Sequence, residues 1–89
     1  MKLYTKLQQL IGTRATKRGI CDSILAITGR TTKLSPFEEN LPENDLGFQF
    51  NLGMDGDTYL DFDIYLIKTR AKSDTSKPIW YVTEINRSY

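Results

Sequence analysis

The chain has 89 residues, with 12 lysines and arginines against 11 aspartates and glutamates, one cysteine and no histidine. This length supports one small hydrophobic core, so we expect a single domain over residues 1–89. Without histidine the chain lacks the usual general base and the commonest metal ligand, and one cysteine excludes an internal disulfide and a Cys-His zinc site. We therefore expect a protein that is not an enzyme, with no catalytic residues, no metal and no cofactor.

The near-neutral total conceals three blocks of alternating charge. Residues 1–34 carry seven cations and one aspartate, residues 35–63 carry eight carboxylates and no cation, and residues 64–89 carry five cations and two carboxylates. The net charges are thus +6, −8 and +3. Folding can interleave such blocks, so mutual compensation is the simplest expectation, and separate surface patches are the functional alternative.

Two amphipathic helices are predicted in the first 30 residues. The first apolar stripe, at spacings i, i+4, i+7 and i+8, consists of Leu3, Leu7, Leu10 and Ile11. This helix should end near Gly12, and the polar, basic segment 12–19 is predicted to connect the two helices. A second stripe consists of Ile20, Ile24 and Ile27. Gly29 is placed to end this helix, although the β-branched residues leave open a strand over residues 23–28.

Residues 31–45 form an irregular segment with two prolines and four acidic residues. Ser35 to Glu38 matches a capping box with proline in the first helical position, which predicts one helical turn. Pro42 should end that turn.

Strict alternation of apolar and polar residues predicts a β-hairpin in the middle of the chain. Leu46 to Leu52 and Leu60 to Leu66 each alternate, and the turn Gly53 to Asp57 contains an Asp-Gly pair. Alternation of this kind indicates strands with one buried face, and Asp-Gly favours the positive φ of tight turns.

A polar loop is expected over residues 69–77, followed by a third strand from Ile79 to Ile85. Pro78 lies at the start of this strand, where the N–H that proline lacks is not needed for a hydrogen bond of the sheet. The expected fold is α+β, with two N-terminal helices packed on a three-stranded antiparallel meander. If residues 23–28 form a strand, the alternative is one helix on a four-stranded antiparallel sheet.

The residues that could carry chemistry have simpler structural explanations. The aspartates around the hairpin turn lack the spacing of a calcium-binding EF-hand loop. Asp61 and Asp63 share a strand face as paired carboxylates, but no other residue indicates a substrate pocket. Cys21 has no histidine to activate it and is expected to be a structural thiol.

The outward face of the second hairpin strand alternates tyrosine and aspartate. Aromatic residues concentrate at the energetic centres of protein interfaces, and carboxylates select a basic partner. We therefore predict a small protein-interaction module, such as an accessory subunit, adaptor or inhibitor, that binds a basic protein surface or self-associates. The predicted partner-binding residues are Tyr59, Asp61, Asp63, Tyr65 and Trp80, with Tyr81 as the alternative to Trp80.

The alternative function is nucleic-acid binding through the basic N-terminal region, because cations near helix ends can hold phosphates. The predicted contacts are Arg14, Lys17, Arg18, Arg30 and Lys33. The large acidic block counts against a dedicated nucleic-acid binder. No segment has the length of a membrane span or the apolar run of a secretory signal, and the solitary cysteine suits a reducing compartment. We therefore expect a cytoplasmic protein without a membrane partner.

Overall fold

The computed structural model describes residues 3–36, 45–72, 74 and 76–88. It is an α+β fold with helices and a five-stranded antiparallel sheet. The elements are α1 (Leu3–Leu7), the 3-10 helix η1 (Gln8–Leu10), β1 (Arg14–Ala15), α2 (Lys17–Thr28), β2 (Ser35–Pro36), β3 (Asp45–Asp55), β4 (Thr58–Lys72) and β5 (Pro78–Arg87). The strand order is β1-β5-β4-β3-β2, so the long strands form a central meander and the two-residue strands lie at the edges.

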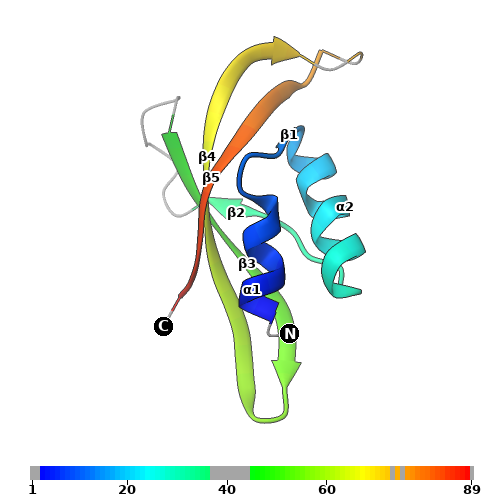
Figure 1. Cartoon of the computed structure of the whole chain (residues 1–89), viewed down its shortest axis with the longest axis vertical. Helices are drawn as coiled ribbons and strands as arrows, with labels where there is room; N and C mark the ends of the chain where they lie inside the picture. The colour runs from blue at the N-terminus through cyan, green and yellow to red at the C-terminus, as the bar shows by residue number, and fades with distance from the viewer. Residues whose placement is uncertain (1–2, 37–44, 73, 75, 89) are drawn as a thin grey trace.

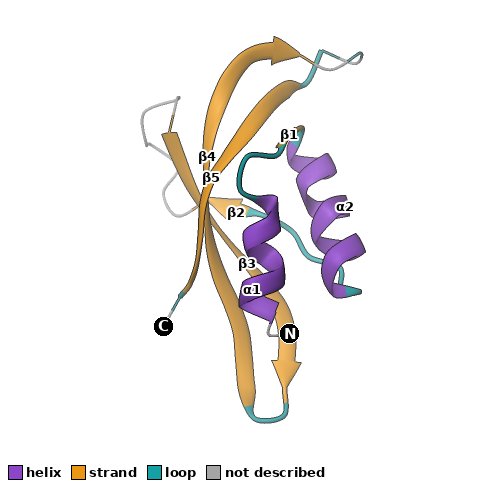
Figure 2. Ribbon diagram, viewed as in Figure 1, coloured by secondary structure: helices purple, strands orange, loops and turns teal. Residues whose placement is uncertain are grey.

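Both helices lie on the same side of the sheet, which gives the molecule two layers (Figure 1). Figure 2 shows that, among the described residues, no helix covers the opposite face of the sheet. The alternating apolar residues of the strands meet the helix stripes in one core. Its buried members are Leu7, Leu10, Ile20, Ile24, Phe48, Phe50, Leu52, Leu60, Phe62, Ile64, Leu66, Trp80, Val82 and Ile85.

The α+β class is confirmed, and the expected number of strands is wrong in detail. Both the three-stranded meander and the four-stranded alternative lack β1 and β2, because two-residue strands show no periodicity in a sequence. The alternative strand over residues 23–28 is also wrong, since that segment belongs to α2. The helical turn expected after Ser35 is replaced at Ser35–Pro36 by β2, and its remaining residues lie outside the described part of the chain.

Helix α2 begins and ends at residues suited to capping. Thr16 is the N-cap, and its Oγ1 accepts the N–H of Gly19 at 3.0 Å. Such a cap satisfies one of the donors that a first helical turn leaves unpaired. Gly29 takes a left-handed conformation with φ of 72° and donates its N–H to the carbonyl of Leu25, as expected for a terminating glycine.

The hairpin of β3 and β4 forms as predicted, with a tighter turn. Strand β3 continues to Asp55, so the loop contains only Gly56 and Asp57, and Gly56 has a φ of 64°. The register pairs Phe50 with Phe62, whose rings stack at 5.4 Å between centroids. Pairing in register places the apolar residues of both strands against the helices.

The expected loop over residues 69–77 is wrong at its start, because β4 continues to Lys72. Asp45 of β3 pairs with Ile67, so β4 extends beyond the first described residue of β3. Lys68 still pairs with Trp80, and Lys72 pairs with Pro78. The end of β4 and the start of β5 therefore form a two-stranded extension, and we call residues 68–72 with 77–80 the ribbon.

The edge of β5 is closed by segments from the N-terminus. The Val82 carbonyl accepts the Gly12 N–H at 2.8 Å, and the Val82 N–H donates to Thr13 at 3.0 Å. Further along the strand, Nε2 of Gln8 donates to the carbonyl of Ile85 at 2.8 Å. These bonds occupy groups that an edge strand would otherwise offer to another chain.

The opposite edge, along β3, is closed by side chains from the segment after α2. Thr32 Oγ1 donates to the carbonyl of Asn51 at 2.7 Å. Nη1 of Arg30 donates to the carbonyls of Leu52 at 2.8 Å and Met54 at 3.2 Å. This is the position of a register shift between Asn51 and Met54, where the regular ladder is interrupted.

Candidate functional site

The predicted tyrosine and aspartate residues of β4 all lie on the face of the sheet that the helices leave uncovered. We call it the open face. Tyr59 is 57% exposed, whereas Asp61, Asp63 and Tyr65 are half-buried. Because Asp61 pairs in register with Asn51, the surface continues across neighbouring strands. The structure thus brings these four predicted residues onto one continuous surface.

Both aspartates of the open face are held by hydrogen bonds. Asn51 Nδ2 donates to Oδ1 of Asp61, and the Ser88 hydroxyl donates to Oδ1 of Asp63 at 2.8 Å. The Ser88 N–H also donates to the backbone carbonyl of Asp61 at 3.1 Å. A carboxylate can accept several hydrogen bonds, so these oriented groups can bind a further donor.

A groove of about 710 Å³ lies beside Asp61. Its walls come from β3 and from the segment that follows α2, and they are mainly hydroxyl and amide groups. The polar side chains that line it include Thr31, Lys33, Ser35, Gln49, Asn51, Asp61 and Ser88, so one predicted phosphate-binding cation lies in this groove. The open face is therefore hollowed on its β3 side, and the hollow carries hydrogen-bonding groups.

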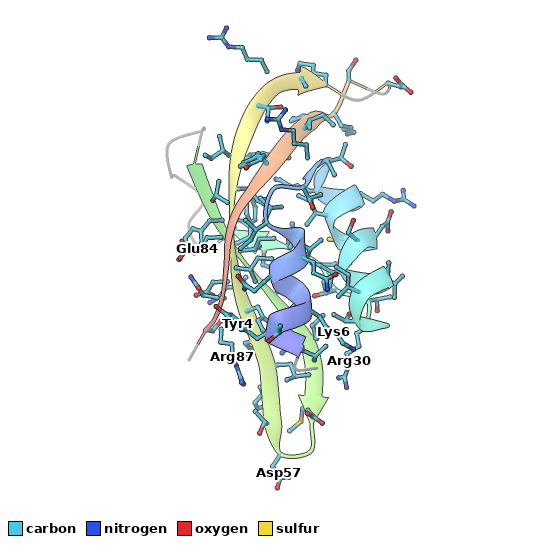
Figure 3. The ribbon with its side chains drawn as sticks, in the orientation of Figure 1. Tyr4, Lys6, Arg30, Asp57, Glu84 and Arg87 are labelled. Carbon is cyan, nitrogen blue, oxygen red and sulfur yellow. The ribbon has the colours of Figure 1, made fainter. Side chains whose placement is uncertain are left out.

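The prediction that Trp80 shares this face is wrong. Trp80 is 5% exposed and packs in the core, with its ring edge-on to that of Phe48 at 6.1 Å between centroids. The alternative, Tyr81, lies on the open face, where it pairs in register with Ile67 and carries the Arg14 guanidinium 5.4 Å from its ring centroid. Figure 3 shows Glu84 on the side of the sheet away from the helices, so β5 also contributes a carboxylate there.

The five predicted phosphate-binding cations do not gather in one place. Arg14, Lys17 and Arg18 lie at β1 and the start of α2, whereas Arg30 and Lys33 follow the end of α2. The 12 residues of α2 separate the two groups by about 18 Å. Arg30 holds β3 carbonyls, which gives its guanidinium a structural role. Three of the five therefore lie at one end of α2 and two at the other.

Residues of the expected polar loop 69–77, together with Lys68, join Arg14, Lys17 and Arg18 at this end of the molecule. The ribbon carries Lys68, Arg70, Lys72 and Lys77, all of them exposed. Lys68, Arg70 and Lys72 alternate with Thr69 and Ala71, which continues the two-residue periodicity of β4. This periodicity could have predicted that the strand extends to Lys72.

The remaining candidates from the sequence are a metal site and Cys21. Within residues 3–36, 45–72, 74 and 76–88, no three acidic or cysteine side chains lie close enough together to hold a metal ion. Cys21 is half-buried, and burial raises the pKa of its thiol, while a backbone hydrogen bond at Leu34 lowers it and Asp22 raises it further. A raised pKa reduces the thiolate fraction and hence the nucleophilicity of this cysteine.

Comparison of the chain with protein-family models, with curated proteins and with solved structures found no match. None of the helices in the described part of the chain has the length and apolar character needed to cross a membrane.

Proposed function

We propose that the protein is a non-catalytic interaction module whose open face binds a partner protein with a basic surface. The observation that carries the proposal is a sheet face that no described helix covers and on which Tyr59, Asp61, Asp63 and Tyr65 lie together. Tyrosines supply large contact areas with little loss of side-chain entropy, and carboxylates around them favour lysine and arginine.

The groove beside Asp61 supports the same proposal. It offers hydroxyl and amide groups next to an oriented carboxylate. Because Lys33 also lines the groove, we place the lysine or arginine side chain of the partner beside Asp61. We place this interaction in the cytoplasm, since a solitary thiol is compatible with a reducing compartment.

The test uses peptides selected from a random library for binding to the purified protein. We expect enrichment in lysine and arginine, and chemical-shift changes on peptide addition that centre on Tyr59, Asp61, Asp63 and Tyr65. The double variant Asp61→Asn, Asp63→Asn keeps the hydrogen-bonding oxygens and removes two charges. It should weaken binding roughly three- to tenfold, as expected for two exposed ion pairs.

The matched control is Asp55→Asn, Asp57→Asn, which removes the same charge at the hairpin turn. Its affinity for the selected peptides should stay close to that of the wild type. Peptides without basic enrichment, or equal losses in both double variants, would contradict the proposal. Self-association, measured by light scattering, would identify a second copy as the partner if the open-face variant alone abolished it.

A further inference from the structure

Seven exposed cations from three separate segments gather at one end of the molecule, and we call them the basic end. Strand β1 brings its residues to the start of β5, where Ala15 pairs with Trp80. The ribbon places Lys68 on the other side of the same tryptophan. The members of the basic end are Arg14, Lys17, Arg18, Lys68, Arg70, Lys72 and Lys77.

A cleft of about 410 Å³ lies between the start of α2 and the start of β5. Its lining residues include Lys17 and Arg18 on one side and Lys77 on the other, and none of the described lining residues is acidic. The Lys17 ammonium lies 5.1 Å from the ring centroid of Trp80 and 4.9 Å from that of Phe48, so aromatic rings back the positive charge. Clefts lined by one sign of charge and backed by apolar walls concentrate the electric field toward an anionic ligand.

Asp74, between Lys72 and Lys77, reduces the charge of the basic end from +7 to +6, and the acidic block of the hairpin does not cancel this field. The described acidic hairpin lies at the opposite end of a molecule 40 Å long, and Figure 3 shows Asp57 at its tip. The Debye length at physiological ionic strength is about 8 Å, so the charges at the two ends act almost independently on a ligand in solution.

The shape of the basic end favours a double-stranded ligand. Figure 1 shows the far end of β4 and β5 curving toward the side on which α2 lies, so the ribbon and the start of α2 face a common space. The major groove of B-form DNA admits a two-stranded β-ribbon. The deep and narrow major groove of A-form RNA does not admit one.

We propose that the basic end binds the backbone of double-stranded DNA, with the ribbon in the major groove and Lys17 and Arg18 on the adjacent phosphates. The contacts are made by charged side chains to phosphates, so binding should depend little on base sequence. Arg14 lies over Tyr81 of the open face, but none of the seven cations is among the residues proposed to bind the protein partner, so this site does not require that partner.

The experiment measures binding of a fluorescently labelled short DNA duplex by anisotropy over a range of salt concentrations. Between five and seven phosphate contacts predict a slope of log affinity against log salt of roughly −4 to −6. Between about 50 and 200 mM salt the affinity should therefore fall roughly 300- to 4,000-fold.

The test variant is Lys68→Gln, Arg70→Gln, Lys72→Gln, which removes three cations from exposed positions of the ribbon. The matched control, Lys6→Gln, Lys33→Gln, Arg87→Gln, removes the same charge elsewhere, and Figure 3 shows Lys6 and Arg87 away from the ribbon. The ribbon variant should lose at least tenfold in affinity and flatten the salt slope by about 3. The control should change both quantities much less, and circular dichroism should show that both variants are folded.

Four results would overturn the proposal. These are no binding of duplex DNA at low salt, tighter binding of single-stranded DNA or duplex RNA, tighter binding of vesicles that contain phosphatidylserine, and equal losses in the ribbon and control variants. The open-face variant Asp61→Asn, Asp63→Asn should retain DNA affinity, so that failure of one proposal can be distinguished from failure of the other.

Discussion

Strand β4 belongs to two hairpins that differ in charge and in how the body of the protein holds them. Its first half carries Asp61 and Asp63 opposite β3, and its second half carries the ribbon cations opposite β5. The acidic hairpin is held by hydrogen bonds to its carboxylates and by Arg30 at its edge. The ribbon is held at its base by the buried ring of Trp80.

This difference is the basis of our proposal that one continuous strand serves two kinds of ligand. Carboxylates in the acidic hairpin are oriented by neighbours before any partner arrives, which lowers the entropy lost on binding. The lysine and arginine side chains of the ribbon are exposed and long. They suit the phosphate backbone of DNA, which requires positive charge more than exact geometry. The two ends should consequently respond differently to substitution.

The largest expected effect is at the base of the ribbon. Trp80→Ala removes a buried aromatic ring from contact with Phe48 and should lower the free energy of unfolding by about 3–5 kcal/mol. Urea denaturation followed by circular dichroism measures the change. Tyr59→Ala, on the open face, should change stability by no more than about 0.5 kcal/mol. A small loss in Trp80→Ala would mean that the ring does not support the ribbon.

An intermediate effect is expected at the edge of the acidic hairpin. Arg30→Ala leaves the carbonyls of Leu52 and Met54 without their charged donor and should cost about 1.5–3 kcal/mol. Lys33→Ala is the control, because this exposed residue also lies after α2, and it should cost less than about 0.5 kcal/mol. Equal losses, measured in urea as above, would contradict the structural role assigned to Arg30.

The smallest expected effect is at the start of α2, beside the basic end. Thr16→Ala removes the acceptor for the Gly19 N–H and should destabilise the protein by about 1 kcal/mol. Thermal unfolding would detect this loss, and Thr31→Ala in the exposed segment after α2 serves as the comparison. Thr16→Ser, which keeps the hydroxyl, should restore most of the stability if the cap is the cause.

Periodicity predicted the parts of the fold in which one strong pattern dominates. The β3–β4 hairpin and α2 follow from strict alternation and from the isoleucine stripe that ends at Gly29. The first helix is shorter than its stripe suggested, because Ile11 follows η1 and is 43% exposed. Short-range spacing cannot reveal where a 3-10 turn replaces an α-helical one.

The faces of β5 could not be predicted in the same way. Val82 and Ile85 both lie in the core although they are three residues apart. The register against β4 shifts there, since Tyr65 pairs with Glu84 and Leu66 with Val82. Such a bulge reverses the alternation along a strand, and so Trp80 could not be assigned to a face from the sequence alone.

The gathering of cations depends on contacts between distant segments. Arg14 and Lys77 are brought to one end only because β1 pairs with β5. A local sequence pattern cannot predict pairing between segments that are far apart in the chain. Strand β1 also has only two residues, which is too short to show a periodicity. The sequence therefore identified the charged blocks, and tertiary pairing determined which of their members meet.

The hydrogen bonds along both sheet edges also bear on how copies of this protein behave at high concentration. Donors from Gln8, Arg30 and Thr32 occupy carbonyls that an incoming strand would need. No described strand pairs with β4 beyond Ile67 on the side of β3, so the ribbon is where a foreign strand could add. Lysine and arginine side chains there would repel an identical ribbon, and the charges proposed to hold DNA would also keep the protein from polymerising with itself.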